Sequence, residues 1–489
     1  MTDIKCSCFE MVWPAGVIIS FMKLLARLKD ARFYLLALLV FTAPLSLHPS
    51  ISLPVLNFPS FRIGLYQLLA IAFVLICLPL ICRGLLKASK NKLFVLLGFM
   101  LAIVFVVGLS QSLVPTRTLL YSGSFLALLL LGFTAYIVFR DLGPGKHRAL
   151  TRYLLWSGIV FGVLAIGQLL LATFGEATTL CRNCTDQIFG FPRINLFAAE
   201  PQFFASSLLP SFFAALLLSD MPRRLRIWSL VFSAVAIGLT FSRGAFFALA
   251  AAIIVLAAIL AIKKYWSGLR SLVKWTLLAF ISVLAGLGLL VASASYIHRD
   301  SDHITYNTAA SALDHLTLGI IYLPQRVEPS NQPTNPNFQP AGLIEESSDE
   351  RLGAADRAID AWNDSPRTLL FGVGMGNLGA YVKQNIIAYA PSDLTVYIFY
   401  VLLLAEAGLI GLATFLIIAS ILIKRLLGLV NKPFGVFMFA LITAFVIHFW
   451  FFGSYINVMY VYVWAGIAFA YAARHQLYPS GNSRIIDTD

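Results

Sequence analysis

Apolar runs that repeat along most of this chain constrain its fold more than any other feature of the sequence. Each run has about the 20 residues with which an α-helix crosses the hydrocarbon core of a bilayer. Hydrophobic residues make up 59% of the 489 residues and charged residues only 12%, whereas about a quarter of the residues of a soluble protein are charged. Because lone strands would leave backbone groups unpaired in lipid, the runs predict helices and an all-α polytopic membrane protein.

Twelve such runs can be placed, with one long external loop between the ninth and the tenth. The seventh and eighth are the hardest to separate, because only Ser242, Arg243 and Gly244 stand between them. The predicted spans are 31–47, 62–82, 93–110, 118–139, 153–174, 196–218, 227–242, 244–262, 275–295, 394–422, 434–453 and 455–472.

Basic residues predict the orientation of these helices. With twelve spans both termini lie on one side of the membrane, and the segments on that side hold 25 of the 36 Lys and Arg residues. Since cytoplasmic segments of membrane proteins carry an excess of Lys and Arg, we expect that side to be the cytoplasm. The net charge of +13 then reflects the orientation of the protein in the membrane and does not indicate a nucleic-acid-binding surface.

The predicted spans divide the chain into five parts. Residues 1–30 would form a cytoplasmic N-terminal segment with an interfacial helix, and 31–295 would hold transmembrane helices one to nine. Residues 296–393 would form the external, periplasmic loop, which contains an amphipathic helix. Residues 394–472 would hold helices ten to twelve, and 473–489 would form a cytoplasmic tail.

The first residues of chemical interest lie at the outer end of span six. Arg193 comes shortly before Glu200 and Pro201, and the spacing places Glu200 about one helical turn below the outer surface. A carboxylate at that depth is costly unless it is paired or hydrated, which favours a site residue. Alternatively, Glu200 only caps a helix that begins at Pro201, because proline is common in a first turn.

Arg243 lies at the outer turn between spans seven and eight. Gly244 permits a tight reversal there, which would hold a permanently charged side chain with five donors at the membrane surface. A guanidinium suits a phosphate or pyrophosphate, because it can bond two oxygens at once. The alternative is an arginine that extends to lipid headgroups, which is common at helix ends.

A surface helix is predicted late in the external loop, after a centre rich in Pro and Asn at 324–340. Ser347 and Glu350, three residues apart, form a capping box at the start of this helix. We expect the helix to lie along the outer surface like a lid. Its apolar stripe consists of Leu352, Ala355, Ile359 and Trp362.

Two arginines of this surface helix lie off the apolar stripe. They are Arg351 and Arg357. Either could pair with a neighbouring carboxylate, Asp356 or Asp360, and for Arg357 this pairing is the favoured interpretation.

Glycine is concentrated between 372 and 379, but this cluster is not a nucleotide-binding loop. No strand precedes the cluster, and no Gly-Lys-Ser/Thr step follows. We expect its glycines to bring the backbone close to a glycan or to the membrane surface.

Glu406, twelve residues into span ten, would lie roughly 18 Å deep, which favours an internal hydrogen bond over catalysis. Gly408 and Gly411 would admit a neighbouring helix.

His448 is the ionisable residue nearest the outer end of span eleven. Two interpretations stay open for it. It is either a member of a site at that surface or a structural hydrogen-bond donor within the membrane.

Several of these pieces together resemble the O-antigen ligase and O-antigen polymerase superfamily. In that family a Ser-Pro step precedes Gly-X-Gly-X-Gly-Asn, as Ser365-Pro366 precedes 372–377 here. The segment 404–411 matches the family's Leu-Ala-Glu-X-Gly-Leu-X-Gly helix, and Tyr400 stands at the family's tyrosine. The Ser-Arg-Gly turn and the Arg, then Glu-Pro pattern at the head of span six are also similar, so the resemblance covers roughly 190–420.

One position departs from the family pattern. The family's ligases carry a histidine just before the Glu-X-Gly helix, and Tyr397 occupies that place here, with Ile398 at the place of an asparagine. A tyrosine, with a reference pKa of about 10, is a poor base. The resemblance therefore looks closer to the polymerase branch, in which Glu200 would accept the proton.

The resemblance implies an integral membrane glycosyltransferase of the bacterial inner membrane. It would polymerise repeat units linked to undecaprenyl pyrophosphate into O-antigen, capsule or exopolysaccharide, on the periplasmic face and with inversion. Its partners would be the lipid-linked glycan, the bilayer and a chain-length regulator protein. No acidic Asp-X-Asp pair lies near the site, so we expect no metal and no cofactor.

The same resemblance assigns roles to individual residues. Glu200 and Arg243 would be catalytic, and Gly244, Gly374, Gly376, Glu406 and Gly408 structural. The expected substrate-binding residues are Arg193, Arg243, Arg351, Arg357, Asn377, Tyr397, Tyr400 and His448.

Two other functions remain alternatives at this point. An O-antigen ligase would transfer the same glycan to lipid A core instead of to a second repeat unit. A transporter or flippase of lipid-linked sugars is also compatible with twelve spans, but the two halves of the chain show no repeat and the polar features gather at the outer side rather than at the midplane.

Overall fold

The structure is a computed structural model of the chain, and it is built almost entirely of helices. The residues that it describes are 30–46, 50–52, 62–174, 187–188, 191–198, 200–297, 342–388, 394, 396–453 and 458–477. A first helix covers 30–41. The labelled helices are α2 (Leu65–Ala88), α3 (Lys92–Ser110), α4 (Pro115–Arg140), α5 (Pro144–Thr173), α6 (Pro201–Leu217), α7 (Arg223–Thr240), α8 (Arg243–Ile262), α9 (Trp266–Ile297), α11 (Gly342–Asn363), α12 (Pro366–Phe371), α13 (Leu378–Asn385), α14 (Phe399–Leu427), α15 (Pro433–His448) and α16 (Met459–Leu477).

The predicted fold class is confirmed, because a helix lies at every apolar run. Among the described residues, seven helices are long and apolar enough to cross a membrane by length and composition. Two further apolar helices, α6 and α15, are shorter, and α7 begins with the basic sequence Arg223-Arg224-Leu225-Arg226. The predicted division between the seventh and eighth spans is also confirmed, since α7 ends at Thr240 and α8 begins at Arg243.

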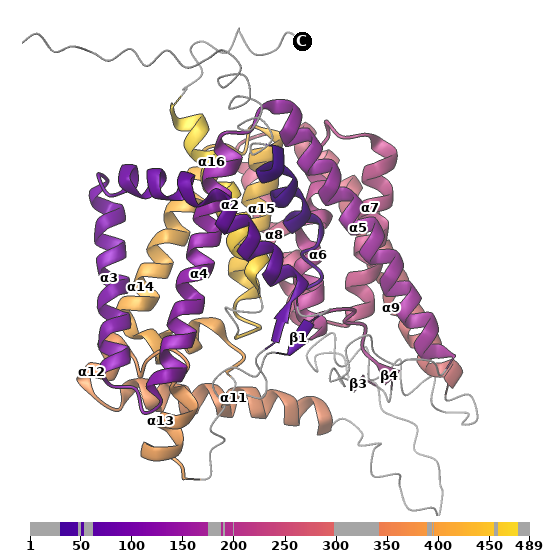
Figure 1. Cartoon of the computed structure of the whole chain (residues 1–489). Helices are drawn as coiled ribbons and strands as arrows, with labels where there is room; N and C mark the ends of the chain where they lie inside the picture. The colour runs from indigo at the N-terminus through magenta and orange to yellow at the C-terminus, as the bar shows by residue number, and fades with distance from the viewer. Residues whose placement is uncertain are drawn as a thin grey trace, which may run out of the picture.

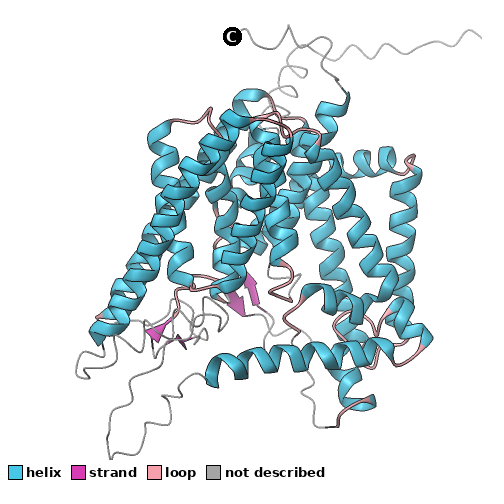
Figure 2. Ribbon diagram, turned by 180° about the vertical axis from the view of Figure 1, so that it is seen from behind, coloured by secondary structure: helices cyan, strands magenta, loops and turns pink. Residues whose placement is uncertain are grey.

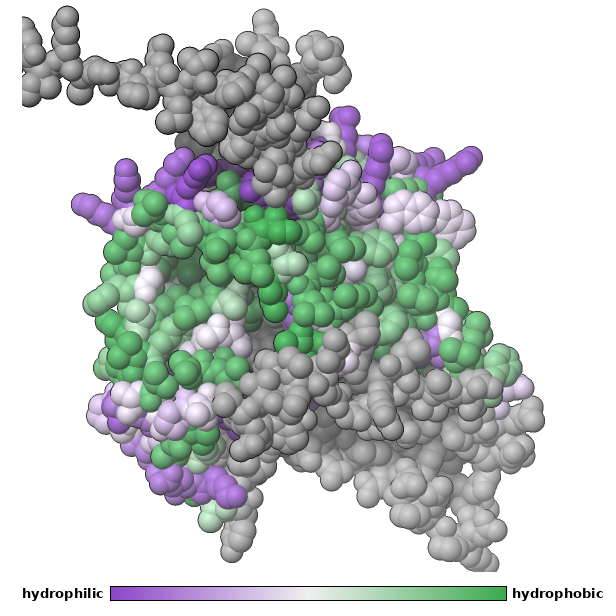
Figure 3. All heavy atoms as spheres, viewed as in Figure 1, coloured by the Kyte–Doolittle hydropathy of each residue, from purple (hydrophilic) through white to green (hydrophobic). Residues whose placement is uncertain are grey.

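The helices run alongside one another between two ends of a bundle (Figures 1 and 2). One end carries α11 to α13, with α11 lying across the bundle (Figure 2). Two short antiparallel strand pairs lie at the same end, β1 (Ser50–Ser52) with β2 (Arg62–Gly64) and β3 (Gln187–Ile188) with β4 (Phe191–Pro192). Figure 3 shows a broad hydrophobic band between hydrophilic residues at both ends, as a membrane protein requires.

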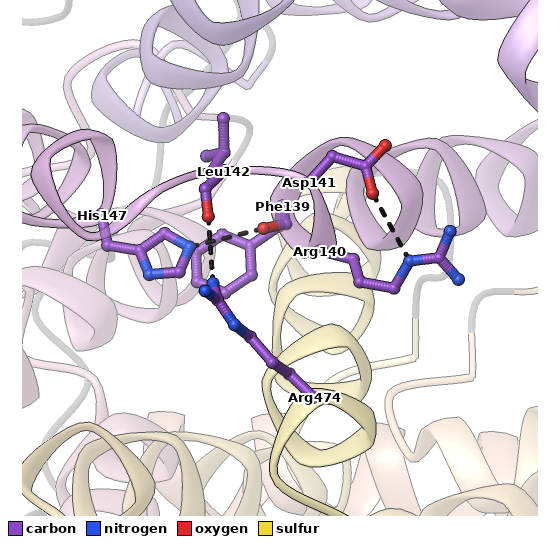
Figure 4. A network of polar contacts seen from close by, with 6 residues as sticks. All are labelled: Phe139, Arg140, Asp141, Leu142, His147 and Arg474. Carbon is purple, nitrogen blue, oxygen red and sulfur yellow. Dashed lines mark hydrogen bonds and ion pairs between the residues drawn. The ribbon is translucent and has the colours of Figure 1, made fainter. Parts of the chain in front are cut away.

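At the end opposite α11, basic side chains donate to the carbonyls of the helix ends. Arg474 Nη1 of α16 donates to the Leu142 carbonyl at 3.0 Å, in the turn between α4 and α5 (Figure 4). The His147 ring stacks on Phe139 with 4.3 Å between centroids, and its Nε2 lies 3.4 Å from the Phe139 carbonyl oxygen. The last carbonyl groups of a helix have no N–H partner within the helix. These side chains supply the missing hydrogen-bond donors.

Two more basic residues repeat this arrangement. Lys263 Nζ, in the turn after α8, donates to the Leu427 carbonyl at the end of α14 at 2.9 Å. Arg226 Nε donates to the Ala215 carbonyl in the last turn of α6 at 3.0 Å, and its guanidinium lies over the Trp275 ring at 4.4 Å. Basic residues that the sequence concentrates at this end therefore also join neighbouring helices.

Helix α14 is interrupted in its first third. Gly408 has φ 67° and ψ −171°, which is not helical. The interruption takes two carbonyls, those of Ala405 and Glu406, out of the helical pattern. The first accepts a hydrogen bond from Val373 N at 2.9 Å and the second from Gly374 N at 3.0 Å. A loop distant in sequence thus replaces the missing hydrogen bonds, as buried backbone groups require.

The glycines of this loop let it touch three different helices. Gly372, Gly374 and Gly376 all have positive φ, of 73°, 97° and 70°. A Cβ on Gly372 would overlap the Glu406 carbonyl of α14. One on Gly374 would lie 2.8 Å from the Gly108 oxygen of α3, and one on Gly376 2.7 Å from Cγ of Tyr121 in α4. The loop therefore approaches three helices of the protein itself, a role of these glycines that the sequence did not suggest.

The expectations for α14 also need correction. The helix begins at Phe399 and not near 394, so Glu406 lies seven residues into it, roughly 10 Å along the axis rather than 18 Å. Glu406 is buried, as expected. Gly408 does not simply admit a helix: it breaks its own helix, and a Cβ there would overlap the Leu370 carbonyl at the end of α12.

Helix α11 exists as predicted, but its start and its buried face differ. It begins at Gly342, so positions 347 and 350 lie inside the helix and not at its start. Its described buried face consists of small residues, whereas Leu352 is 58% and Ile359 41% exposed. The large apolar residues suggested the wrong face, since close packing of this helix uses alanine. The buried residues are Ala354, Ala355, Ala358 and Ala361.

Helices α11, α12 and α13 hold together through two side-chain hydrogen bonds. Trp362 Nε1 donates to the Leu369 carbonyl at 2.9 Å, joining α11 to α12. Tyr381 of α13 donates its hydroxyl to Asp364 Oδ2 at 2.5 Å. Burial and this hydrogen bond raise the pKa of Tyr381 to about 12, so the phenol stays protonated and keeps donating at neutral pH.

Substituting Gly372 with alanine should destabilise the protein. A left-handed backbone costs an alanine roughly 1–2 kcal/mol, and the new Cβ would also overlap the α14 backbone. We expect a lower thermal midpoint for detergent-purified Gly372→Ala, measured by size-exclusion after heating. Gly353→Ala is the control, because nothing lies within 4 Å of a Cβ at that helical position. Equal midpoints for the two variants would contradict the proposed bridging role of the loop.

Candidate functional site

Three helix ends meet on the side of the bundle that carries α11. They are the starts of α6 and α8 and the end of α15, and α15 packs against both of the others. Aromatic pairs join them, with 5.4 Å between the ring centroids of Phe203 and Phe452 and 5.6 Å between those of Phe247 and Phe451. The sequence-predicted residues Glu200, Arg243 and His448 stand at these three ends.

The turn from α7 to α8 is made by Phe241 and Ser242. Phe241 adopts a left-handed conformation with φ 51°, and Ser242 Oγ accepts from Ala245 N at 3.4 Å to cap α8. Gly244 is therefore not the reversal that the sequence suggested. Its missing side chain instead makes room for the end of α15, because a Cβ would lie 2.5 Å from Phe451 Cβ and 3.4 Å from His448 Cδ2.

Arg193 reaches the same turn from the segment before α6. Its Nε donates to the Thr240 carbonyl at 3.2 Å and its Nη2 to the Phe241 carbonyl at 3.3 Å. These contacts satisfy carbonyls at the end of α7 and bring the Arg193 guanidinium to the turn that carries Arg243. The structure therefore gathers two of the predicted anion-binding residues at one place, where their charges can act together.

Glu200 occupies the N-cap position of α6, with Pro201 in the first turn. Its carboxylate makes no capping hydrogen bond to the helix, and Oε2 instead accepts from Gln202 Nε2. Glu200 therefore stands at the cap position, as the alternative interpretation expected, but its side chain does not cap the helix. The carboxylate is partly exposed.

His448 ends α15 and is completely buried, with 0% exposure. Its ring stands edge-on to Phe452 with 4.6 Å between centroids. Among the residues that the structure describes, neither Nδ1 nor Nε2 has a hydrogen-bond partner. The structure therefore gives no support to the interpretation of His448 as a structural hydrogen-bond donor.

The segment that leads into α14 is tied to the end of α15. Phe399 N donates to the Phe449 carbonyl at 3.0 Å, and the Tyr400 hydroxyl donates to the Val446 carbonyl at 2.6 Å. Tyr400 thus joins two helices in the structure. Tyr397, which stands at the family's histidine, lies beneath the Arg351 guanidinium at 4.7 Å from the ring centroid.

Arg357 and Asn377 complete the predicted set. No ion pair joins Arg357 to Asp356 or Asp360, all three of which are described residues, so the pairing favoured by the sequence is not seen.

Asn377 is buried, and its Nδ2 donates to the Val373 carbonyl at 2.8 Å, within the glycine loop. Its Oδ1 is buried without a partner. Asn377 thus supports the loop.

Metal-ligating residues do not gather in the described part of the chain, which holds no group of three or more His, Cys, Asp or Glu suited to a metal ion.

Sequence reasoning missed the break at Gly408 and the contact between Gly244 and α15. The Glu-X-Gly step could have signalled the first, since a glycine in a membrane helix is also a common break.

A comparison with family models gives a match to part of the chain. Residues 228–416 match the family described as O-antigen ligase. The match covers less than half of the chain, and this region is similar to that family. The seven described helices that are long and apolar enough to cross a membrane indicate a multi-pass membrane protein.

The matched region contains the Ser242 to Gly244 turn, the glycine loop and the break in α14. Arg193, Glu200 and His448 lie outside it, although the structure places them at the same end of the bundle. No curated protein shows a significant match to the chain.

Proposed function

We propose that the protein is a polysaccharide polymerase. It transfers a glycan from an undecaprenyl-pyrophosphate donor to a sugar hydroxyl of a second lipid-linked repeat unit. The observation that carries the proposal is that the Arg193 guanidinium contacts the turn between α7 and α8, at which Arg243 begins α8. Paired guanidinium groups suit the two phosphates of such a donor.

The start of α8 adds to the attraction for an anion. Arg243 is its first helical residue, and the N-terminus of a helix carries partial positive charge and unbonded N–H groups. A pyrophosphate bound there gains negative charge as the glycan leaves, so the same groups stabilise the transition state. Arg193 holds the turn in position through the Thr240 and Phe241 carbonyls.

The reaction needs one proton acceptor and one leaving group. Glu200 removes the proton from the acceptor hydroxyl as its oxygen forms a bond to the anomeric carbon. The bond from that carbon to the phosphate oxygen breaks with inversion, and its electron pair leaves with the polyprenyl pyrophosphate. The proton on Glu200 then passes to water, and no metal or cofactor takes part in the proposed reaction.

The choice of polymerase over ligase rests on Tyr397. The ring of this residue packs beneath Arg351, and a phenol with a reference pKa of about 10 is poorly suited to accept a proton at neutral pH. The matched family description favours the second candidate, an O-antigen ligase that transfers to lipid A core. The two candidates differ in the acceptor and not in the donor.

The proposed setting is the bacterial inner membrane, with both termini in the cytoplasm and the site on the periplasmic face. The surface helix α11 then lies at the periplasmic membrane surface, where exposed Leu352 and Ile359 can contact lipid. Arg351 and Arg357 extend the basic surface toward the substrate. A chain-length regulator protein is the proposed partner.

Cysteine labelling tests this orientation. In a cysteine-free background, Asp360→Cys on α11 should react with a membrane-impermeant maleimide in intact spheroplasts. Lys90→Cys, in the turn between α2 and α3, should react only after lysis. Both positions are exposed, so accessibility alone does not separate them. The reverse pattern would place the site in the cytoplasm. A cysteine at Asn335, the position that the sequence suggests for this test, lies outside the described residues.

Substitution of Arg243 tests the donor site. Arg243→Ala should lower the transfer rate by on the order of 10²-fold or more. Arg243→Lys should recover little, because a point charge cannot reproduce the bidentate fork. Arg193→Ala should weaken donor use in the same direction. Arg367→Ala, an exposed arginine of α12, is the control and should keep wild-type rates. Wild-type transfer by Arg243→Ala would remove this turn from the donor site.

An in-vitro reaction separates polymerase from ligase. Purified protein receives lipid-linked repeat units with and without lipid A core. We expect a ladder of lipid-linked products without core, lost in Glu200→Gln and largely kept in Tyr397→Phe, which preserves the ring beneath Arg351. Transfer only to core, with Tyr397→Phe inactive and Glu200→Gln active, would establish the ligase instead.

A further inference from the structure

His448 is a buried polar group that the proposed mechanism does not yet use. The ring has 0% exposure, and both of its nitrogens lack a hydrogen-bond partner within the described part of the chain. Burying an imidazole in this way destabilises a protein compared with an apolar residue of similar size. A buried polar group without partners therefore points to a role beyond packing.

The surroundings of His448 indicate what that role is. Cδ2, the ring atom bonded to Nε2, lies 3.4 Å from the position of a Cβ on Gly244. Gly244 is the second helical residue of α8 and directly follows Arg243. The Cδ2 side of the imidazole thus lies against the first turn of α8, where the helix start favours an anion.

The rings around His448 separate it from the start of α6. Phe452 stands against the imidazole at 4.6 Å and against Phe203 at 5.4 Å between ring centroids. Phe203 lies one turn after Glu200, the proposed proton acceptor. His448 therefore lies on the side of the leaving group and not on the side of the acceptor hydroxyl.

We propose that His448 is a third donor of the pyrophosphate site. The neutral ring carries its proton on Nε2 and donates a hydrogen bond to a phosphate oxygen that Arg243 also binds. The ring is fully buried and Phe452 lies against it, so the donor reaches it only when the contacts around the ring rearrange. The inference rests on the proposed function, because it assigns the ligand of the same turn between α7 and α8.

Two substitutions distinguish this role from a structural one. His448→Gln keeps an N–H at the reach of Nε2, whereas His448→Phe keeps the ring shape and removes both nitrogens. Binding is measured with farnesyl pyrophosphate as the probe, on the full-length protein in nanodiscs. We expect His448→Phe to weaken binding by about tenfold, which is the loss of one hydrogen bond to a charged group. His448→Gln should stay within about threefold of wild type.

Each result bears on a separate part of the argument. Wild-type affinity in His448→Phe, with Arg243→Ala impaired, overturns this inference alone and leaves the proposed function standing. Equal losses in His448→Gln and His448→Phe also overturn it, because a donated hydrogen bond would then not be the cause. Wild-type binding by Arg243→Ala removes the proposed donor site itself. Thermal midpoints of all variants verify folding, and an apolar phenylalanine should leave the midpoint equal or higher.

Discussion

The pair of hydrogen bonds from Val373 and Gly374 to the carbonyls of Ala405 and Glu406 is the interaction on which the end of the bundle that carries α11 depends. In lipid no water is available to satisfy a broken helix. The interruption at Gly408 is therefore stable only while the glycine loop lies against it. The same contact fixes α12 and the loop to the bundle, since Leu370 abuts Gly408.

This break sets the direction of the first part of α14 independently of the rest of the helix. Phe399 and Tyr400 in that part bond to the last carbonyls of α15, those of Phe449 and Val446. The position of the α15 end, and of His448 with it, is thus linked to the glycine loop through backbone contacts. A loop without charged side chains of its own contributes to the geometry of a site that it does not line.

The sequence predicted the helical class and the boundary between α7 and α8, because hydropathy acts locally. It failed where one residue type serves several purposes. Gly408 was expected to ease packing and breaks a helix, and Gly244 was expected to turn the chain and accommodates α15. The face of α11 was misassigned because alanines bury it, while Leu352 and Ile359 stay exposed. Each error depends on a contact with a distant segment, which no local pattern encodes.

The alternating glycines of the loop bear on how the sequences of related chains should be compared. Gly372, Gly374 and Gly376 meet α14, α3 and α4 respectively, so each is constrained by a different neighbour. Evolution would then keep all three for reasons of architecture, whatever sugar the enzyme handles. If relatives share these three glycines, the shared glycines would reflect the requirements of folding. Differences in substrate would appear instead in the side chains of the proposed site, at the ends of α6, α8 and α15.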